Sequence, residues 1–142
     1  MREQLGEHFA SFNWAHVCTL TPKVHDCTPR SLAREFERGF IRRLERSAQR
    51  RVCWVRALER SPGGIFHLHA LVAGTQCLQE KAIERKWKLG LAHVRRYDRT
   101  RGAAWYIVKS YGDERATWES LEVSRHMPPV WFDSRSDQSR AA

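Results

Sequence analysis

Two histidines separated by one residue form the part of this sequence best suited to metal chemistry. They stand in the segment His67-Leu68-His69, within an apolar run that continues to Val72. Alternate residues of a β-strand point to the same face of a sheet, so a strand here would present both imidazoles together. Paired neutral imidazoles suit a divalent metal ion, although this spacing alone is a weak signal.

A carboxylate upstream strengthens the metal hypothesis. Glu59 ends the preceding apolar segment, and the turn sequence SPGG separates it from His67. If the resulting hairpin places residue 59 opposite residue 67, the carboxylate and both imidazoles share one face of the sheet. Such a donor set, with positions left for water and phosphate, suits Mg²⁺ or Mn²⁺. The alternative is that Glu59 pairs with a surface arginine such as Arg56 or Arg60.

A tyrosine near position 106 is a candidate nucleophile. Apolar residues at spacings of three and four predict the buried stripe of a helix, made of Ala104, Ile107, Val108 and Tyr111. Tyr106 and Lys109 fall off this stripe and are neighbours one turn apart. A phenol attacks phosphate only when its phenolate is stabilised by a metal or a cation, because its ordinary pKa keeps it protonated. The alternative is an amphipathic surface tyrosine.

The elements that would position these side chains follow from the hydrophobic pattern. We expect strands at 16–22, 52–59, 66–73, 91–97 and 118–124, and helices from Pro29 onward, at 78–89 and at 103–111. The order β-α-β-β-α-β-α-β predicts an α+β domain over residues 1–125, with an antiparallel sheet of the ferredoxin-like or RNA-recognition kind and covering helices. Residues 126–142 are expected to form an irregular tail.

The helix that begins at Pro29 combines an apolar side with many arginines. Thr28 provides an N-cap, and proline occupies the first helical position. The apolar side consists of Leu32, Phe36, Phe40, Ile41 and Leu44. The other faces carry Arg30, Arg34, Arg38 and Arg42, with glutamates between them. A solvated face explains these arginines as well as a face that contacts DNA.

The charge balance favours a nucleic-acid partner. Lys and Arg total 25 against 16 acidic residues, which gives a net charge of +9 and a pI near 10.0. An inert basic surface is the alternative. The sequence has no apolar run near the roughly 18 residues of a membrane span and no signal peptide, so we expect a cytoplasmic protein without a membrane partner.

The four cysteines are widely separated, at Cys18, Cys27, Cys53 and Cys77. A structural zinc site would need closely paired ligands, so none is expected. Cys18 and Cys53 lie within apolar runs, which predicts buried thiols in a reducing compartment.

Taken together, three segments resemble the three motifs of HUH endonucleases. They read VCTLTP at 17–22, LERSPGGIFHLHALV at 58–72 and AWYIVK at 104–109. The resemblance is strongest to the nicking domain of rolling-circle replication initiators (Rep proteins), and it spans residues 16 to about 111. Each motif is modestly specific, and their order and spacing together are more so.

The resemblance implies a ferredoxin-like fold around a five-stranded antiparallel sheet. It implies that Glu59, His67 and His69 hold Mg²⁺ or Mn²⁺, that Tyr106 is the nucleophile, and that Lys109 positions phosphate or metal ligands. The implied activity is sequence-specific nicking and rejoining of single-stranded DNA or an origin hairpin through a 5′-phosphotyrosine, by a monomer. Many initiators carry a C-terminal helicase, which this sequence lacks, so a host helicase is an expected partner.

Other functions remain open. A single-tyrosine transposase of the same superfamily usually has a glutamine four residues past the tyrosine, where this chain has Ser110. A relaxase normally has its tyrosine near the N-terminus, ahead of three histidines. A non-catalytic RNA-recognition-like domain would have stacking aromatics on its central strands, where this chain has His67 and His69. The tryptophans expected to be exposed for single-strand binding are Trp87, Trp105 and Trp118.

Overall fold

A five-stranded antiparallel sheet organises the part of the chain that the computed structural model describes, residues 2–23, 27–61, 63–108 and 121–128. Its strands are β1 (His16–Pro22), β2 (Cys53–Arg60), β3 (Phe66–Ala73), β4 (Gly90–Arg96) and β5 (Leu121–Val123). They lie in the order β4-β1-β3-β2-β5, and every pairing is antiparallel. The chain between β1 and β2 crosses over β3, as in a split β-α-β unit. The predicted ferredoxin-like or RNA-recognition-like α+β class is confirmed.

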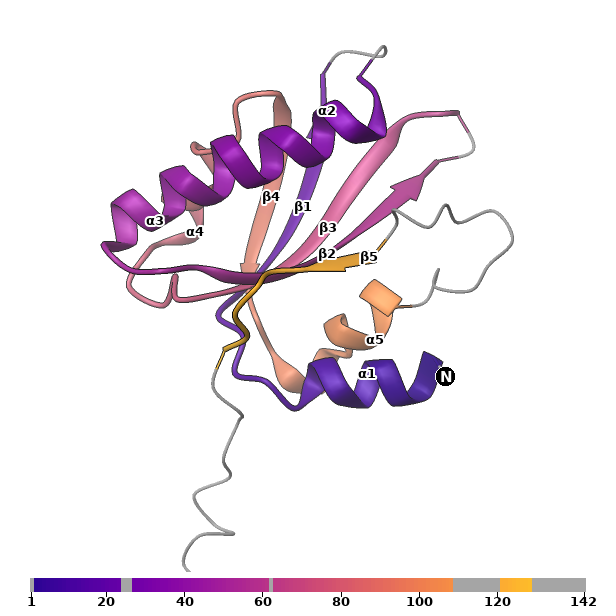
Figure 1. Ribbon diagram of the computed structural model, residues 1–142, viewed down its shortest axis with the longest axis vertical. Coiled ribbons are helices and arrows are strands. Elements are labelled where there is room, and N and C mark those ends of the chain that lie inside the picture. Colours follow the sequence, from indigo (N-terminus) through magenta and orange to yellow (C-terminus); the bar gives the residue numbers. More distant parts are fainter. Residues whose placement is uncertain (1, 24–26, 62, 109–120, 129–142) are drawn as a thin grey trace, which may run out of the picture.

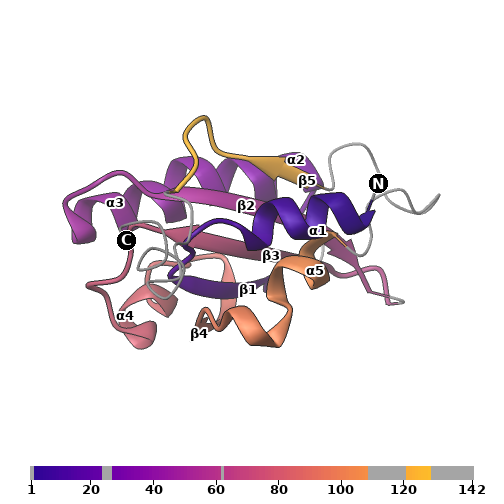
Figure 2. The same ribbon diagram turned by 90° about the horizontal axis from the view of Figure 1, so that it is seen from below.

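Helices cover both faces of the sheet (Figures 1 and 2). On one face lie α4 (Glu80–Glu84) and a long continuous helix made of α2 (Pro29–Arg34), the π-helical η1 (Glu35–Ile41) and α3 (Arg42–Ala48). Below the other face lie α1 (Arg2–Ala10) and α5 (Ala103–Val108), after the short 3₁₀ turn η2 (Arg99–Arg101). The sheet is therefore the middle of three layers.

Two helices differ from the sequence prediction. α1 was not predicted, because its residues are mixed in charge and the buried large side chain is Phe9. α4 ends at Glu84 rather than near residue 89, and Gly90 begins β4 instead of ending a helix. A Cβ at Gly90 would collide with the Thr21 carbonyl oxygen, so this glycine allows β4 to approach β1. α5 begins at Ala103, as predicted, whereas the predicted end of this helix at residue 111 and the start of the 118–124 strand lie outside the described residues.

Each face of the sheet has its own apolar core. Under the long helix, Leu32, Phe36, Phe40 and Leu44 are fully buried. They pack with Cys18, Leu20, Leu68, Ala70 and Val72 from β1 and β3. On the other face, α1 and α5 pack through Phe9, Ala104 and Ile107 on Val17, Val55 and Leu71. The predicted alternation along β3 is confirmed, with His67 and His69 on the α5 side.

Arg56 is a buried cation rather than the surface residue expected from the sequence. It is 2% exposed and forms ion pairs with Glu122 at 2.8 Å and Glu37 at 3.4 Å. Its guanidinium also lies over the Trp54 ring, 5.6 Å from the centroid. These contacts join the long helix to β2 and the edge strand β5. They also remove Arg56 as a partner for Glu59.

The four cysteines are free thiols that differ in exposure. Cys18 is fully buried, and this burial raises the pKa of its thiol to about 12. Cys18 and Cys53 were both predicted to be buried, but Cys53 is only partly buried. Cys77 is exposed. In the described part of the chain, no helix has the length and apolar character needed to cross a membrane.

Gly6 of α1 sets how closely α5 approaches. A Cβ at this position would overlap the indole ring of Trp105 on α5. We expect Gly6→Ala to lower the free energy of unfolding by on the order of 1 kcal/mol, because overpacking costs about 1–3 kcal/mol and exceeds the gain in helix propensity of about 1 kcal/mol. Urea unfolding of the variant and the native chain measures this difference.

The matched test uses a background without the indole. In a Trp105→Ala chain the same Gly6→Ala change should raise stability, because only the propensity gain remains. A Gly6→Ala chain as stable as the native protein would contradict the close-contact argument.

Candidate functional site

The three predicted metal ligands, Glu59, His67 and His69, lie at the turn end of the β2–β3 hairpin, on the sheet face that α1 and α5 cover. Glu59 pairs directly with His67 across the two strands, which meets the condition on which the shared face of the three side chains depended. One pair further along, His69 lies between Ala57 of β2 and Thr19 of β1. Because successive pairs on one face are spaced two residues apart, the carboxylate and both imidazoles are neighbours on this face.

Glu59 contacts two of the other predicted residues. The Nε2 atom of His69 lies 2.8 Å from Glu59 Oε2. The Tyr106 hydroxyl donates to the same carboxylate oxygen at 3.3 Å. The rings of His69 and Tyr106 also meet edge to face, with centroids 5.1 Å apart. Glu59 therefore joins the histidine pair to the candidate nucleophile.

The alternative partners proposed for Glu59 are engaged elsewhere. Arg60 stacks over the Phe66 ring, with 5.6 Å between the guanidinium carbon and the ring centroid. Arg56 is held in the opposite core by Glu122. The interpretation of Glu59 as the partner of a surface arginine is therefore wrong for both residues.

Two threonines of β1 hold the histidines from the other side. Thr21 Oγ1 and His67 Nδ1 form a hydrogen bond of 2.9 Å, and Thr19 Oγ1 lies 3.5 Å from His69 Nδ1. Such contacts orient an imidazole and fix which nitrogen carries the proton, as second partners of metal-binding histidines commonly do. Sequence reasoning missed these two residues. The signal was present in CTLTP, where both threonines fall on alternate positions of a strand.

Two imidazoles and a carboxylate are donor types that bind divalent metal ions, although the donors are not already gathered around one point. Among the described residues, no group of three or more His, Cys, Asp and Glu side chains is arranged to hold a metal ion. An ionised carboxylate only accepts hydrogen bonds, so this contact with ionised Glu59 requires the form of His69 that carries a proton on Nε2. Metal binding through that nitrogen would release this proton. Glu59, His67 and His69 are neighbours, and binding one metal ion would require them to rearrange.

Tyr106 is the accessible tyrosine among those described. Its side chain is 45% exposed, whereas Ala104, Ile107 and Val108 of the same helix are buried. Its predicted position off the helix stripe is confirmed. Tyr97 follows β4 and is half-buried, and this burial raises the pKa of its phenol. Lys109 and Tyr111 lie outside the described residues.

The open part of this sheet face continues onto β4. Leu91 and His93 are exposed and pair with Thr21 and Thr19 of β1. The described strands carry no phenylalanine, tyrosine or tryptophan on this face, in contrast to an RNA-recognition domain. Trp105 is 41% exposed as predicted, but Trp87 is only 4% exposed and belongs to the opposite core. Trp118 lies outside the described residues.

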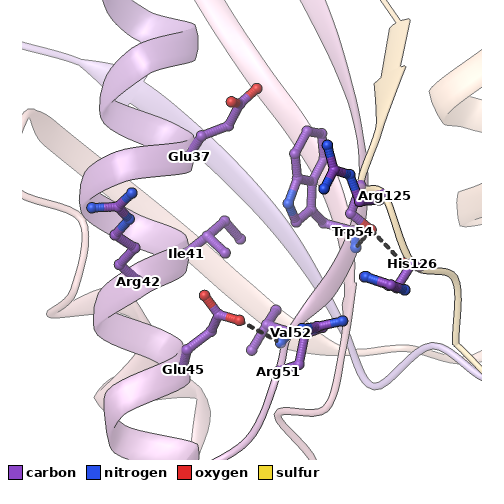
Figure 3. A pocket seen from close by; sticks show the side chains of 10 residues that line it. Glu37, Ile41, Arg42, Glu45, Arg51, Val52, Trp54, Arg125 and His126 are labelled. Atoms are coloured by element: carbon purple, nitrogen blue, oxygen red, sulfur yellow. Dashed lines mark hydrogen bonds between the residues drawn. The ribbon is translucent and has the colours of Figure 1, made fainter.

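Two hollows of the surface lie away from these residues. A cavity of about 240 Å³ separates the long helix from β2 and the segment after β5 (Figure 3). Trp54 lines it, and Glu45 at its edge accepts a hydrogen bond from the Val52 backbone nitrogen at 3.2 Å. A second hollow of about 220 Å³ lies beside Arg30 and Leu58. Neither hollow is lined by Glu59, His67, His69 or Tyr106.

Comparison with protein-family models, with curated protein sequences and with solved structures finds no match for this chain. The likeness to HUH endonucleases therefore rests on the motifs and on the way the fold brings them together.

The contact between Thr21 and His67 gives a direct test of metal binding. We expect Thr21→Val, which keeps a β-branched side chain, to weaken Mn²⁺ binding by roughly 10–100-fold, because the imidazole loses its orienting partner. Isothermal titration with Mn²⁺ measures the affinity without any need for catalysis.

A second threonine–histidine pair provides the control. Thr75 Oγ1 lies 2.7 Å from the buried His16 Nδ1, in the opposite core. Thr75→Val should lower stability by about 1–3 kcal/mol and leave Mn²⁺ affinity unchanged. Native-like Mn²⁺ affinity in Thr21→Val would show that this hydrogen bond does not support a metal ligand.

Proposed function

We propose that this protein is a metal-dependent endonuclease of the HUH kind, which nicks and rejoins single-stranded DNA through a tyrosine and initiates rolling-circle replication. The observation that carries the proposal is the Glu59 carboxylate, whose Oε2 contacts both His69 Nε2 and the Tyr106 hydroxyl. A carboxylate, a histidine pair and an accessible phenol on one sheet face are the groups that such a reaction needs.

The reaction is an exchange of one phosphoester bond for another. The Tyr106 oxygen attacks the scissile phosphorus, a tyrosine–phosphorus bond forms, and the bond from phosphorus to the 3′-oxygen breaks. Glu59, which accepts a hydrogen bond from this hydroxyl at 3.3 Å, would take up the phenolic proton. The leaving 3′-oxygen takes up a proton, so a free 3′-hydroxyl and a 5′-phosphotyrosine result. When this 3′-hydroxyl later attacks the phosphotyrosine, the strand is rejoined and the tyrosine is released, without ATP.

Glu59, His67 and His69 would hold Mg²⁺ or Mn²⁺, with Thr21 and Thr19 orienting the two imidazoles. The ion, when bound, would polarise the scissile phosphate and neutralise charge that develops on it. The resemblance to Rep nicking domains adds Lys109 as a residue that positions phosphate or metal ligands.

The proposed substrate is a single strand or the unpaired part of an origin hairpin. The site lies beside the uncovered part of this sheet face, where Leu91 and His93 extend the accessible surface along β4. A net charge of +9 would attract the phosphate backbone to the protein. The protein would act as a monomer in the cytoplasm. A host helicase would unwind the template.

The nucleophile is tested by comparing two tyrosines. We expect Tyr106→Phe to eliminate the covalent protein–DNA adduct, because it removes the attacking oxygen while it keeps the ring beside His69. Denaturing gel analysis with a 3′-labelled oligonucleotide and Mn²⁺ detects the adduct, and peptide mapping locates it.

Tyr97→Phe is the control, since the half-buried Tyr97 should be dispensable for adduct formation. An adduct of native yield in Tyr106→Phe, or one mapped to another tyrosine, would reject this assignment of the nucleophile.

The metal ligands are tested by removing imidazoles from the same sheet face. His67→Ala and His69→Ala should each abolish Mn²⁺-dependent cleavage and leave the fold intact, because both side chains point away from the core under the long helix. His93→Ala removes an exposed histidine of this face and should cleave as the native chain does. Efficient cleavage by a chain that lacks both His67 and His69 would refute the proposed metal site.

A further inference from the structure

The long helix carries a row of exposed arginines spaced by four residues. The row consists of Arg30, Arg34, Arg38, Arg42 and Arg46, all of them exposed. The fully buried side chains of the same helix, Leu32, Phe36, Phe40 and Leu44, are also spaced by four residues. The two series are offset by two residues, which is half a turn at this repeat. The arginine row therefore runs along the side of the helix opposite to its core contacts.

The π-helical segment keeps this row straight. In an α-helix of 3.6 residues per turn, residues four apart drift by about 40° at each step, so a row of five would wind away from one side. η1 occupies Glu35–Ile41, in the middle of the row. A π-helical turn holds more residues than an α-helical turn, so it reverses the drift between the two α-helical ends. The row spans up to about 24 Å, at the α-helical rise of 1.5 Å per residue over 16 residues.

The arginine row is not neutralised by the glutamates of its own helix. Glu35 pairs with Arg43 at 2.9 Å, and Glu37 turns to the buried Arg56. Glu45 accepts a hydrogen bond from Val52, and Figure 3 shows Arg42 pointing away from Trp54. Among the described residues, none of the five row arginines takes part in an ion pair.

We propose that the arginine row binds the phosphate backbone of duplex DNA, on the face of the sheet opposite to the candidate nicking site. The long helix lies on one side of the sheet, whereas α5 with Tyr106 lies on the other (Figure 1). Five guanidiniums over about 24 Å match about seven base pairs at 3.4 Å each. Guanidinium groups bind phosphate oxygens in pairs of hydrogen bonds, which suits a regular backbone.

The composition of this surface favours duplex DNA over other polyanions. A single strand is normally held by aromatic stacking, but the exposed large apolar residues that the structure describes, Leu91, Trp105, Tyr106 and Val123, all lie outside this helix. Insertion into a membrane would need an exposed apolar helix face, but Phe36, Phe40 and Leu44 are buried between the helix and the sheet. A straight row of arginines on a rigid helix instead fits the regularly spaced phosphates of duplex DNA.

The experiment compares two variants that remove the same charge from the full chain. Arg34→Gln/Arg38→Gln changes the centre of the row, and Arg85→Gln/Lys88→Gln changes two exposed cations beyond α4. Affinity for a blunt random-sequence duplex is measured by anisotropy as a function of salt. The row variant should reduce the slope of log K against log salt by about 1.8, at 0.9 for each of two lost phosphate contacts. The control should keep the native slope.

Two further measurements separate this surface from the nicking site. The row variant should form the adduct with a short single strand at the native rate, whereas Tyr106→Phe should bind the duplex with native affinity. Duplex binding by the arginine row does not depend on the proposed nicking activity. The proposal of duplex binding therefore still holds if no adduct is ever observed. Equal loss in the row and control variants would overturn the proposal, as would a larger loss for single strands or anionic vesicles than for duplex.

Discussion

The arrangement of this protein depends on the register of β3, the central strand. Leu68, Ala70 and Val72 are fully buried under the long helix, while Leu71 is fully buried on the α5 side. A slip of one residue would move His67 and His69 into the apolar core under the long helix and would turn Leu68, Ala70 and Val72 to the site face. Burial on both faces thus fixes the direction of the two imidazoles more strongly than any contact of the imidazoles themselves.

The candidate site combines two kinds of support. The hairpin and β1 are tied by backbone pairing, so Glu59, the histidines and the threonines are placed by the sheet. Tyr106 stands on a six-residue helix, which is held against the sheet by Ala104 and Ile107 and against α1 by the approach of Trp105 to Gly6. The position of the phenol therefore depends on packing between two helices.

Much of this arrangement follows from short-range patterns. The period of two along β3 predicted that the histidines face away from the core residues of that strand. The SPGG turn predicted the hairpin in which Glu59 can pair with His67. The period of 3.6 placed Tyr106 outside the buried stripe. The features that the sequence did not predict depend on partners distant in the chain. Arg56 is buried because Glu122 and Glu37 reach it from two other elements, and α1 is ordered by α5 rather than by a strong pattern of its own.

Because Cys18 is buried, the reactivity of its thiol reports local unfolding of β1. This thiol faces the core under the long helix, one residue before Thr19 on the site face, and burial raises its pKa to about 12. A thiol so protected reacts with an alkylating reagent only when the strand leaves the sheet, whereas the exposed Cys77 reacts directly. The ratio of the two labelling rates therefore measures the free energy of local unfolding for the strand that carries Thr19 and Thr21, in the native protein and without denaturant.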